Sequence, residues 1–214
     1  MKRSFIKSPA KYLVPACAAL AMLSPGAQAE STYGYNASGA AGATARARVN
    51  LEVRVPMLIL LRVGTSGAAI DSVTITAAPN GVPGGIAAAA LANGSNLATG
   101  WNGTAPVMTS TSSPANVTAY AWTNSRNGGS VTGAITTAFT TGGLTGASIA
   151  VASASPVNGG LAHPGTNLGT FTPQAFPANS LRSSTWAYSL TTAALASVTA
   201  GTHSATVTYT ATSL

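Results

Sequence analysis

The stretch ARARVNLEVRV, residues 45–55, decides the fold class of this chain. Apolar and polar residues alternate with a period of two throughout it, which places all of the apolar side chains on one face of a β-strand. Arginine, asparagine and glutamate occupy the opposite face. The apolar face, which we predict to serve strand pairing and assembly, consists of Ala45, Ala47, Val49, Leu51, Val53 and Val55.

Downstream of this stretch, the chain continues as short strand-forming segments separated by turns. Pro56 cannot donate to a ladder and should end or bulge the first strand. The nearly continuous apolar run Met57–Val63 predicts a strand covered on both faces. Asn-Gly dipeptides, which supply positive φ angles, mark tight turns. Further strands are predicted at 70–77, 106–111, 116–123, 130–139, 147–154, 167–172, 185–190 and 201–212, whereas 86–92 is either one helical turn or a strand.

The chain is predicted to contain about eight to ten such strands and no helix long enough for a parallel crossover. This pattern predicts an all-β fold. The expected architecture is an antiparallel β-sandwich. Residues 30–43 are rich in glycine, alanine and serine and show no periodicity, so we expect a flexible leader there. The β-sandwich domain is expected to span residues 44–214.

The N-terminus has the pattern of a signal peptide. Basic residues precede an apolar run over 12–23, and Ala27-Gln28-Ala29 matches a cleavage site. Residues 1–29 are therefore predicted to direct export to the periplasm, the cell surface or the medium. No later window reaches about 18 apolar residues, so no stable membrane span is expected. Cys17, the only thiol, belongs to this segment, so the exported domain should be held by its core alone.

Without the predicted signal peptide, the chain contains six arginines and three acidic residues, which give a net charge of +3. Arg46, Arg48, Arg54 and Arg62 lie close together and suggest a basic patch for nucleic acid or acidic lipid. Their spacing instead follows one face of a strand, and no aromatic residue is interleaved to stack on bases. Export also separates the chain from nucleic acid, so we expect no nucleic-acid partner.

Side chains that could carry catalysis or hold a metal are few. A triad of Asp71, His203 and a serine is conceivable, but no G-x-S-x-G elbow is present. Two histidines, three acids and no thiol do not easily supply a zinc site. We expect both histidines on the surface, His163 in a loop and His203 on the last strand. The sequence therefore predicts no enzymatic activity, no cofactor and no metal.

The aromatic residues suggest a second class of function. Trp186 and Tyr188 share one strand face, and Tyr209 is expected to pair with them across the sheet, so all three are assigned to the core. Trp101 lies between Gly100 and an Asn-Gly turn and is the candidate for an exposed ligand contact. Because aromatic rows on sheets bind glycans, an extracellular carbohydrate-binding module is the alternative function.

Several features together resemble bacterial surface proteins of the fimbrial-subunit, or pilin, type. They are the signal peptide, the glycine-rich start after it, the early amphipathic strand, Trp186-x-Tyr188 and the closing AGTHSATVTY, residues 200–209. The resemblance implies an Ig-like, pilin-like sandwich. In chaperone–usher pilins, an N-terminal extension with alternating apolar residues completes the next subunit by donating a strand. The family's common disulfide is absent here, and 201–212 is expected to supply the chain's own last strand.

The predicted function is that of an exported, non-enzymatic structural or adhesive surface subunit. Its mechanism would be edge-strand pairing, since residues 45–55 alternate over a length that suits a full strand. They would pair either within the domain or with the open sheet of a neighbouring subunit, which is a second copy or a related protein. Glycans are the partners expected under the alternative function.

Overall fold

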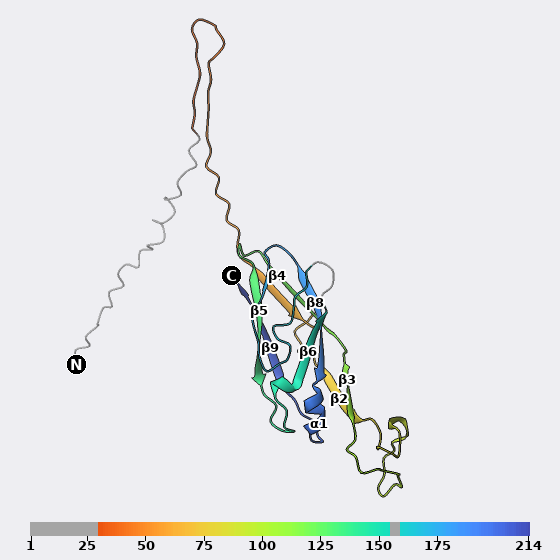
Figure 1. Cartoon of the computed structure of the whole chain (residues 1–214). Helices are drawn as coiled ribbons and strands as arrows, with labels where there is room; N and C mark the ends of the chain where they lie inside the picture. The colour runs from red at the N-terminus through yellow and green to blue at the C-terminus, as the bar shows by residue number, and fades with distance from the viewer. Residues whose placement is uncertain (1–29, 155–158) are drawn as a thin grey trace, which may run out of the picture. The chain divides into compact units, whose positions relative to one another are not determined.

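The computed structural model describes residues 30–154 and 159–214. The predicted signal peptide and Cys17 lie outside the described residues. The chain divides into two units, one ending at Val55 and the other running from Pro56 to Leu214. Among the described residues, all assigned strands belong to the second unit, beginning with Ile59 (Figure 1).

The unit from Pro56 to Leu214 is mostly β, with several antiparallel sheets and one short α-helix (Figure 1). This confirms the predicted class of antiparallel β protein. In chain order, its elements are β1 (Ile59–Val63), β2 (Thr74–Pro79), the 3-10 helix η2 (Ala88–Ala90), β3 (Met108–Ser113), β4 (Val117–Thr123), β5 (Gly129–Thr137), the 3-10 helix η3 (Gly146–Ser148), β6 (Ile149–Ala154), β7 (Gln174–Phe176), β8 (Arg182–Leu190), α1 (Thr192–Ser197) and β9 (Thr206–Ser213).

Strands that are distant in sequence pair with one another. A four-stranded sheet has the order β1-β4-β8-β6, a three-stranded sheet has the order β7-β5-β9, and β2 pairs with β3. Every pair is antiparallel. In the larger sheet, Ala121 of β4 lies opposite Leu61 of β1 and Arg182 of β8. β4 and β8 are thus the central strands, whereas β1 and β6 are its edges.

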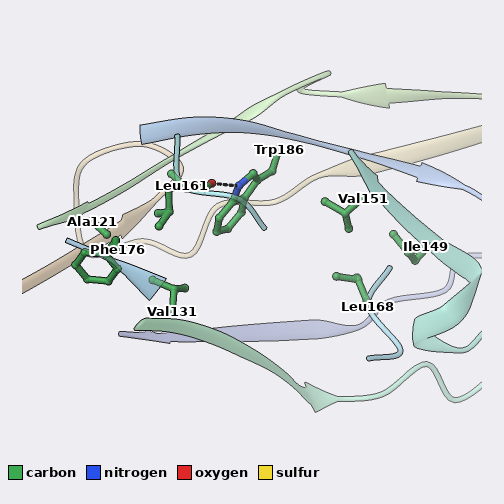
Figure 2. Close-up of a cluster of buried hydrophobic side chains, with 9 residues drawn as sticks. Ala121, Val131, Ile149, Val151, Leu161, Leu168, Phe176 and Trp186 are labelled. Atoms are coloured by element: carbon green, nitrogen blue, oxygen red, sulfur yellow. Dashed lines mark hydrogen bonds between the residues drawn. The ribbon is translucent and has the colours of Figure 1, made fainter. Parts of the chain in front are cut away.

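One hydrophobic core receives side chains from both larger sheets (Figure 2). Trp186 of β8 is fully buried, and its Nε1 donates a hydrogen bond of 3.0 Å to the carbonyl oxygen of Leu161. A large aromatic side chain can be buried in this way because its one polar atom is satisfied. The predicted core role of Trp186 is confirmed. The buried cluster consists of Ala119, Ala121, Val131, Ile149, Val151, Leu161, Leu168, Phe176 and Trp186.

Two predictions about strands are wrong. β1 is not covered on both faces: its side chains alternate between half-buried and exposed, and Leu60 points outward. The strand predicted at 167–172 forms only isolated bridges. The Leu168 amide donates to the carbonyl oxygens of Gly146 and Ile149 instead of to a regular ladder, and the strand that follows is β7.

Local signals explain several of the smaller elements. The glycines of four Asn-Gly pairs, Gly81, Gly103, Gly128 and Gly159, have the positive φ that was predicted for turns. Gly128 joins β4 to β5, and a Cβ there would come 2.3 Å from the carbonyl oxygen of Phe176. Helix α1, which was not predicted, begins after Thr191, whose side chain accepts from the Ala194 amide as an N-cap. None of the helices in the described ranges combines the length and the apolarity needed to cross a membrane.

Candidate functional site

The apolar row of residues 45–55 is exposed. No strand is assigned to the segment, and Figure 1 shows it as an extended trace. Val49, Leu51, Val53 and Val55 are between 73% and 85% exposed. An amphipathic strand is stable only when its backbone pairs and its apolar face packs, and neither condition is met here. The described residues record no ladder for this segment, so its expected pairing, either within the domain or with a neighbouring subunit, stays a prediction.

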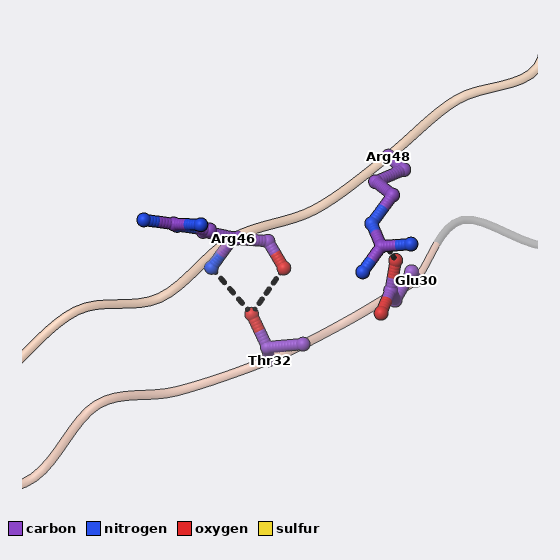
Figure 3. Close-up of polar contacts among 4 residues, drawn as sticks. All are labelled: Glu30, Thr32, Arg46 and Arg48. Carbon is purple, nitrogen blue, oxygen red and sulfur yellow. Dashed lines mark hydrogen bonds and ion pairs between the residues drawn. The ribbon is translucent and has the colours of Figure 1, made fainter.

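The polar residues around this segment, by contrast, have partners. The Arg46 amide donates to Thr32 Oγ1 at 2.9 Å, and the same hydroxyl donates to the Arg46 carbonyl oxygen at 2.7 Å (Figure 3). The guanidinium of Arg48 lies 3.9 Å from the Glu30 carboxylate. Arg54 and Glu52 form an exposed ion pair at 2.6 Å. These exposed contacts stabilise little. In the part of the chain that the structure describes, the apolar row is the part of the segment that stays exposed.

In the unit from Pro56 to Leu214, the strands β1 and β9 each have one free edge among the described residues. β1 pairs only with β4, and β9 pairs only with β5, so each has one edge without a ladder among the described residues. The two strands nevertheless contact one another across the two sheets. Unpaired edges expose rows of N–H and C=O groups that can template a further strand. The expectation that 201–212 supplies the chain's own last strand is confirmed by β9, which pairs with β5 but has no second neighbour among the described residues.

The opposite edges of the two sheets are protected. The outer edge of β6 is covered by the segment around Thr166: the Val151 amide donates to the Thr166 carbonyl oxygen at 2.8 Å, and Ala150 bridges to Asn167. The edge strand β7 has only three residues. Covering an edge and shortening it are both known ways to prevent unwanted pairing. Over residues 30–154 and 159–214, β1 and β9 therefore remain as the open edges of the two larger sheets that are longer than three residues.

Side chains on the inner faces of these two edge strands are incompletely buried. Ile59, Leu61 and Val63 of β1 and Val207, Tyr209 and Ala211 of β9 pack against the core but stay partly exposed. Inward residues of the central strands, such as Ala119, Ala121 and Trp186, are fully buried. The difference follows from position, since an edge residue has a neighbouring strand on one side only. Sequence alternation could identify the inward residues of β9 but not its missing neighbour.

A buried polar network joins β9 to the larger sheet. His163 is only 4% exposed, so its predicted place on the surface is wrong. Its Nδ1 lies 2.5 Å from the Gly165 carbonyl oxygen and 3.1 Å from the Gly165 amide nitrogen, and its Nε2 lies 2.8 Å from Tyr209 Oη. The Tyr209 oxygen lies 2.9 Å from Tyr188 Oη, which can donate to it. The His-Pro-Gly sequence is typical of an exposed loop, and nothing in it signals that Tyr209 lies across the core.

Burial sets the protonation state of this network. Desolvation lowers the pKa of His163 below its usual value of 6.5, and this effect exceeds the opposing one of its hydrogen bond to Gly165. Desolvation likewise raises the pKa of Tyr188 and Tyr209. The neutral imidazole and the two neutral phenols form a connected chain of hydrogen bonds. A protonated His163 would donate from both nitrogens, so it could no longer accept from the Gly165 amide or from Tyr209 Oη.

The residues considered for a catalytic triad have separate partners. The Asp71 carboxylate accepts from the amide and the hydroxyl of Thr65, at 2.5 and 2.6 Å, and these bonds lower its pKa. His203 precedes β9 instead of lying on it, and it bonds to the Thr141 hydroxyl and the Thr199 carbonyl oxygen. Over the described ranges, no three His, Cys, Asp or Glu side chains gather as metal ligands would.

Trp101, the candidate ligand contact, lies in the long connection between β2 and β3. Its side chain is 58% exposed, as a contact residue should be, and its Nε1 donates to the Thr104 carbonyl oxygen at 2.7 Å. Only the faces of the ring are therefore open to a ligand. No other aromatic residue occurs between residues 80 and 107.

The comparisons with known proteins place the chain in no family. No protein-family model matches it, and no curated protein or solved structure is significantly similar. The resemblance to fimbrial subunits therefore stays a prediction.

Proposed function

We propose that this protein is an exported, non-enzymatic structural or adhesive surface subunit that assembles by β-strand addition. In this proposal, the fold is a pilin-like antiparallel sandwich that lacks one strand. Residues 45–55 of one copy occupy the place of that strand in a neighbouring copy, where they pair with β9 and pack beside β1. The neighbour is a second copy of this chain or a related subunit.

The observation that carries the proposal is that the domain has open strand edges and that the same chain has an amphipathic segment outside any sheet. On one side, β1 and β9 each have one free edge among the described residues and contact each other, and their inward side chains are partly exposed. On the other side, residues 45–55 have the alternation of a strand but belong to no sheet. Peptides that add to open edges gain affinity from main-chain hydrogen bonds and specificity from alternate side chains. Addition of this segment as a strand would pair an open edge and bury the apolar row.

The apolar row is large enough to hold such an assembly together. Fully burying a valine or leucine side chain is worth about 1.5–3 kcal/mol, so the four exposed residues from Val49 to Val55 together offer about 6–12 kcal/mol. Association costs an estimated 4–15 kcal/mol. Burial of the row is therefore comparable with the cost, and the ladder hydrogen bonds and the newly covered β1 and β9 side chains add to it.

The test compares substitutions on the two faces of the segment in the exported chain, residues 30–214. Leu51→Lys with Val53→Lys places charges on the apolar row, whereas Asn50→Lys with Glu52→Lys places them on the polar face of the same segment. Light scattering after size exclusion measures the molar mass, and native gels show any ladder of multimers. We expect multimers with the second pair and monomers with the first. Multimers that survive the first pair, or deletion of residues 30–55, would refute strand addition.

The carbohydrate-binding alternative through Trp101 has less support. A flat sugar-binding surface usually combines several groups, because aromatic faces supply contact area and a few polar groups supply orientation. Trp101 is the only aromatic residue of its connection, and its indole N–H is already used. A different surface of the protein combines these groups.

A further inference from the structure

The outward face of the four-stranded sheet carries an aromatic patch next to a cation. On β4, Tyr120 and Trp122 are two residues apart and point to the same face. Trp122 lies opposite the exposed Leu60 of β1, and Tyr120 lies opposite Arg62. The exposed Leu181, just before β8, lies on the other side. Together, Leu60, Arg62, Tyr120, Trp122 and Leu181, which we name the β1–β4 patch, line an open depression of about 490 Å³.

The Arg62 side chain is oriented by a ring contact, and its guanidinium can still bind an anionic ligand. Its guanidinium carbon lies 4.1 Å from the centre of the Tyr120 ring, a cation–π contact that orients the side chain over the patch. Within residues 30–154 and 159–214, the ion pairs are Arg48–Glu30 and Arg54–Glu52, and Asp71 is bonded to Thr65. Arg62 thus has no carboxylate partner among these residues. A guanidinium fork in this state matches a carboxylate, which it can bind with two parallel hydrogen bonds.

The rim of the patch is polar. Since Ser184 and Trp186 of β8 point into the core, Ser183 and Thr185 point outward beside Tyr120. The patch therefore combines a small flat apolar surface, hydroxyl groups at its side and one oriented cation. Its volume falls in the range of small-molecule sites. A standard protein interface buries about 800 Å² on each partner and has a larger apolar centre, so these few side chains fit a small, ring-shaped ligand better.

We propose that the β1–β4 patch binds an acidic sugar residue of a polysaccharide, a uronate. The apolar C–H face of its pyranose ring stacks on Trp122, because the electron-rich ring face attracts the slightly positive C–H groups. Leu60 and Leu181 flank the stacked ring. The carboxylate lies on Arg62, and the sugar hydroxyl groups reach the Ser183 and Thr185 side.

This site is independent of strand addition. The patch uses outward side chains of the four-stranded sheet, whereas strand addition uses backbone edges and inward side chains of β1 and β9. A monomeric variant with substitutions at Leu51 and Val53 should therefore still bind the sugar. If the subunits do assemble, each copy presents one patch, and weak single contacts would gain strength through multivalency.

The experiment is affinity electrophoresis of the exported chain in gels that contain polygalacturonate, with neutral galactan as the comparison. We expect polygalacturonate to retard the protein and galactan to retard it less. Trp122→Ala and Arg62→Gln should each weaken retention by polygalacturonate at least about tenfold, which corresponds to one lost charge-assisted or stacking contact. Arg126→Gln, an exposed arginine elsewhere, is the matched control and should leave retention unchanged. Trp101→Ala tests the alternative ligand contact, and retention by polygalacturonate that depends on Trp101 would overturn the proposal.

A second measurement on the unaltered protein covers the case in which Trp122→Ala fails to fold. The chain has three tryptophans, whose indole N–H groups give separate signals in a nitrogen–proton NMR spectrum. Adding oligogalacturonate should shift the Trp122 signal and leave those of Trp101 and Trp186 in place. The proposal is overturned if the protein does not bind the polymer, if Arg126→Gln weakens retention as much as Arg62→Gln, or if the shifted signal belongs to Trp101.

Discussion

Leu51→Ala is the substitution that measures strand addition most directly. Leu51 is 85% exposed in the free segment, so nearly all of its side chain would leave water on pairing. The change removes the equivalent of about three methylene groups at about 0.8 kcal/mol each, a loss of about 2.4 kcal/mol in binding free energy. Because about 1.4 kcal/mol corresponds to a factor of ten, we expect the dissociation constant to rise about 50-fold.

The assay uses a fluorescent peptide of residues 45–55 and a chain that consists of residues 56–214. These residues form a unit with their own core, and both proposed acceptor strands belong to it. Fluorescence anisotropy gives the dissociation constant of each peptide. The control is the Glu52→Ala peptide, because Glu52 lies on the polar face and should stay in water. Equal weakening by the two substitutions, or a loss below about threefold for Leu51→Ala, would refute the assigned face.

Two further predictions concern the stability of the domain from Pro56 to Leu214. Because burial lowers the pKa of His163, the folded state keeps a neutral ring; its contribution to stability is complete above about pH 6.5 and is lost as the pH falls from there towards the lowered pKa. Urea unfolding at a series of pH values should show this loss in the wild type and in His203→Gln but not in His163→Gln, and equal slopes in all three would contradict it. Trp186→Ala should lower the free energy of unfolding by about 3–5 kcal/mol or prevent folding, because it empties the core and leaves the Leu161 carbonyl without its donor. Trp101→Ala should stay within about 0.5 kcal/mol of the wild type, since most of that side chain is in water, and similar losses for both would contradict the assigned burial.

Local patterns in the chain were sufficient for the class of fold and for most of its strands. Alternation and Asn-Gly turns located the strands from β1 to β6 and both C-terminal strands to within a few residues. These features depend on neighbours in sequence, through the period of two and the φ angles of glycine. The assignment of Trp186, Tyr188 and Tyr209 to the core followed from the same periodicity. The expected pairing of Tyr209 across the same sheet was wrong, because Tyr209 belongs to the three-stranded sheet and meets Tyr188 across the core. The prediction of a strand at 167–172 was wrong because the Leu168 amide bonds to η3 and β6 instead of to a ladder.

The sequence showed the alternation of residues 45–55, but it did not show whether the segment is paired in a sheet. A period of two shows that a segment can form an amphipathic strand; whether it does depends on a partner elsewhere in the chain or in another molecule. Likewise, alternation predicted that the residues of β9 form a strand. Its position at an open edge beside β1 follows from the order in which distant strands pair. His163 is buried because Tyr209, 46 residues away in sequence, meets it across the core. Contacts of this kind join residues far apart along the chain, so only the folded structure could establish them.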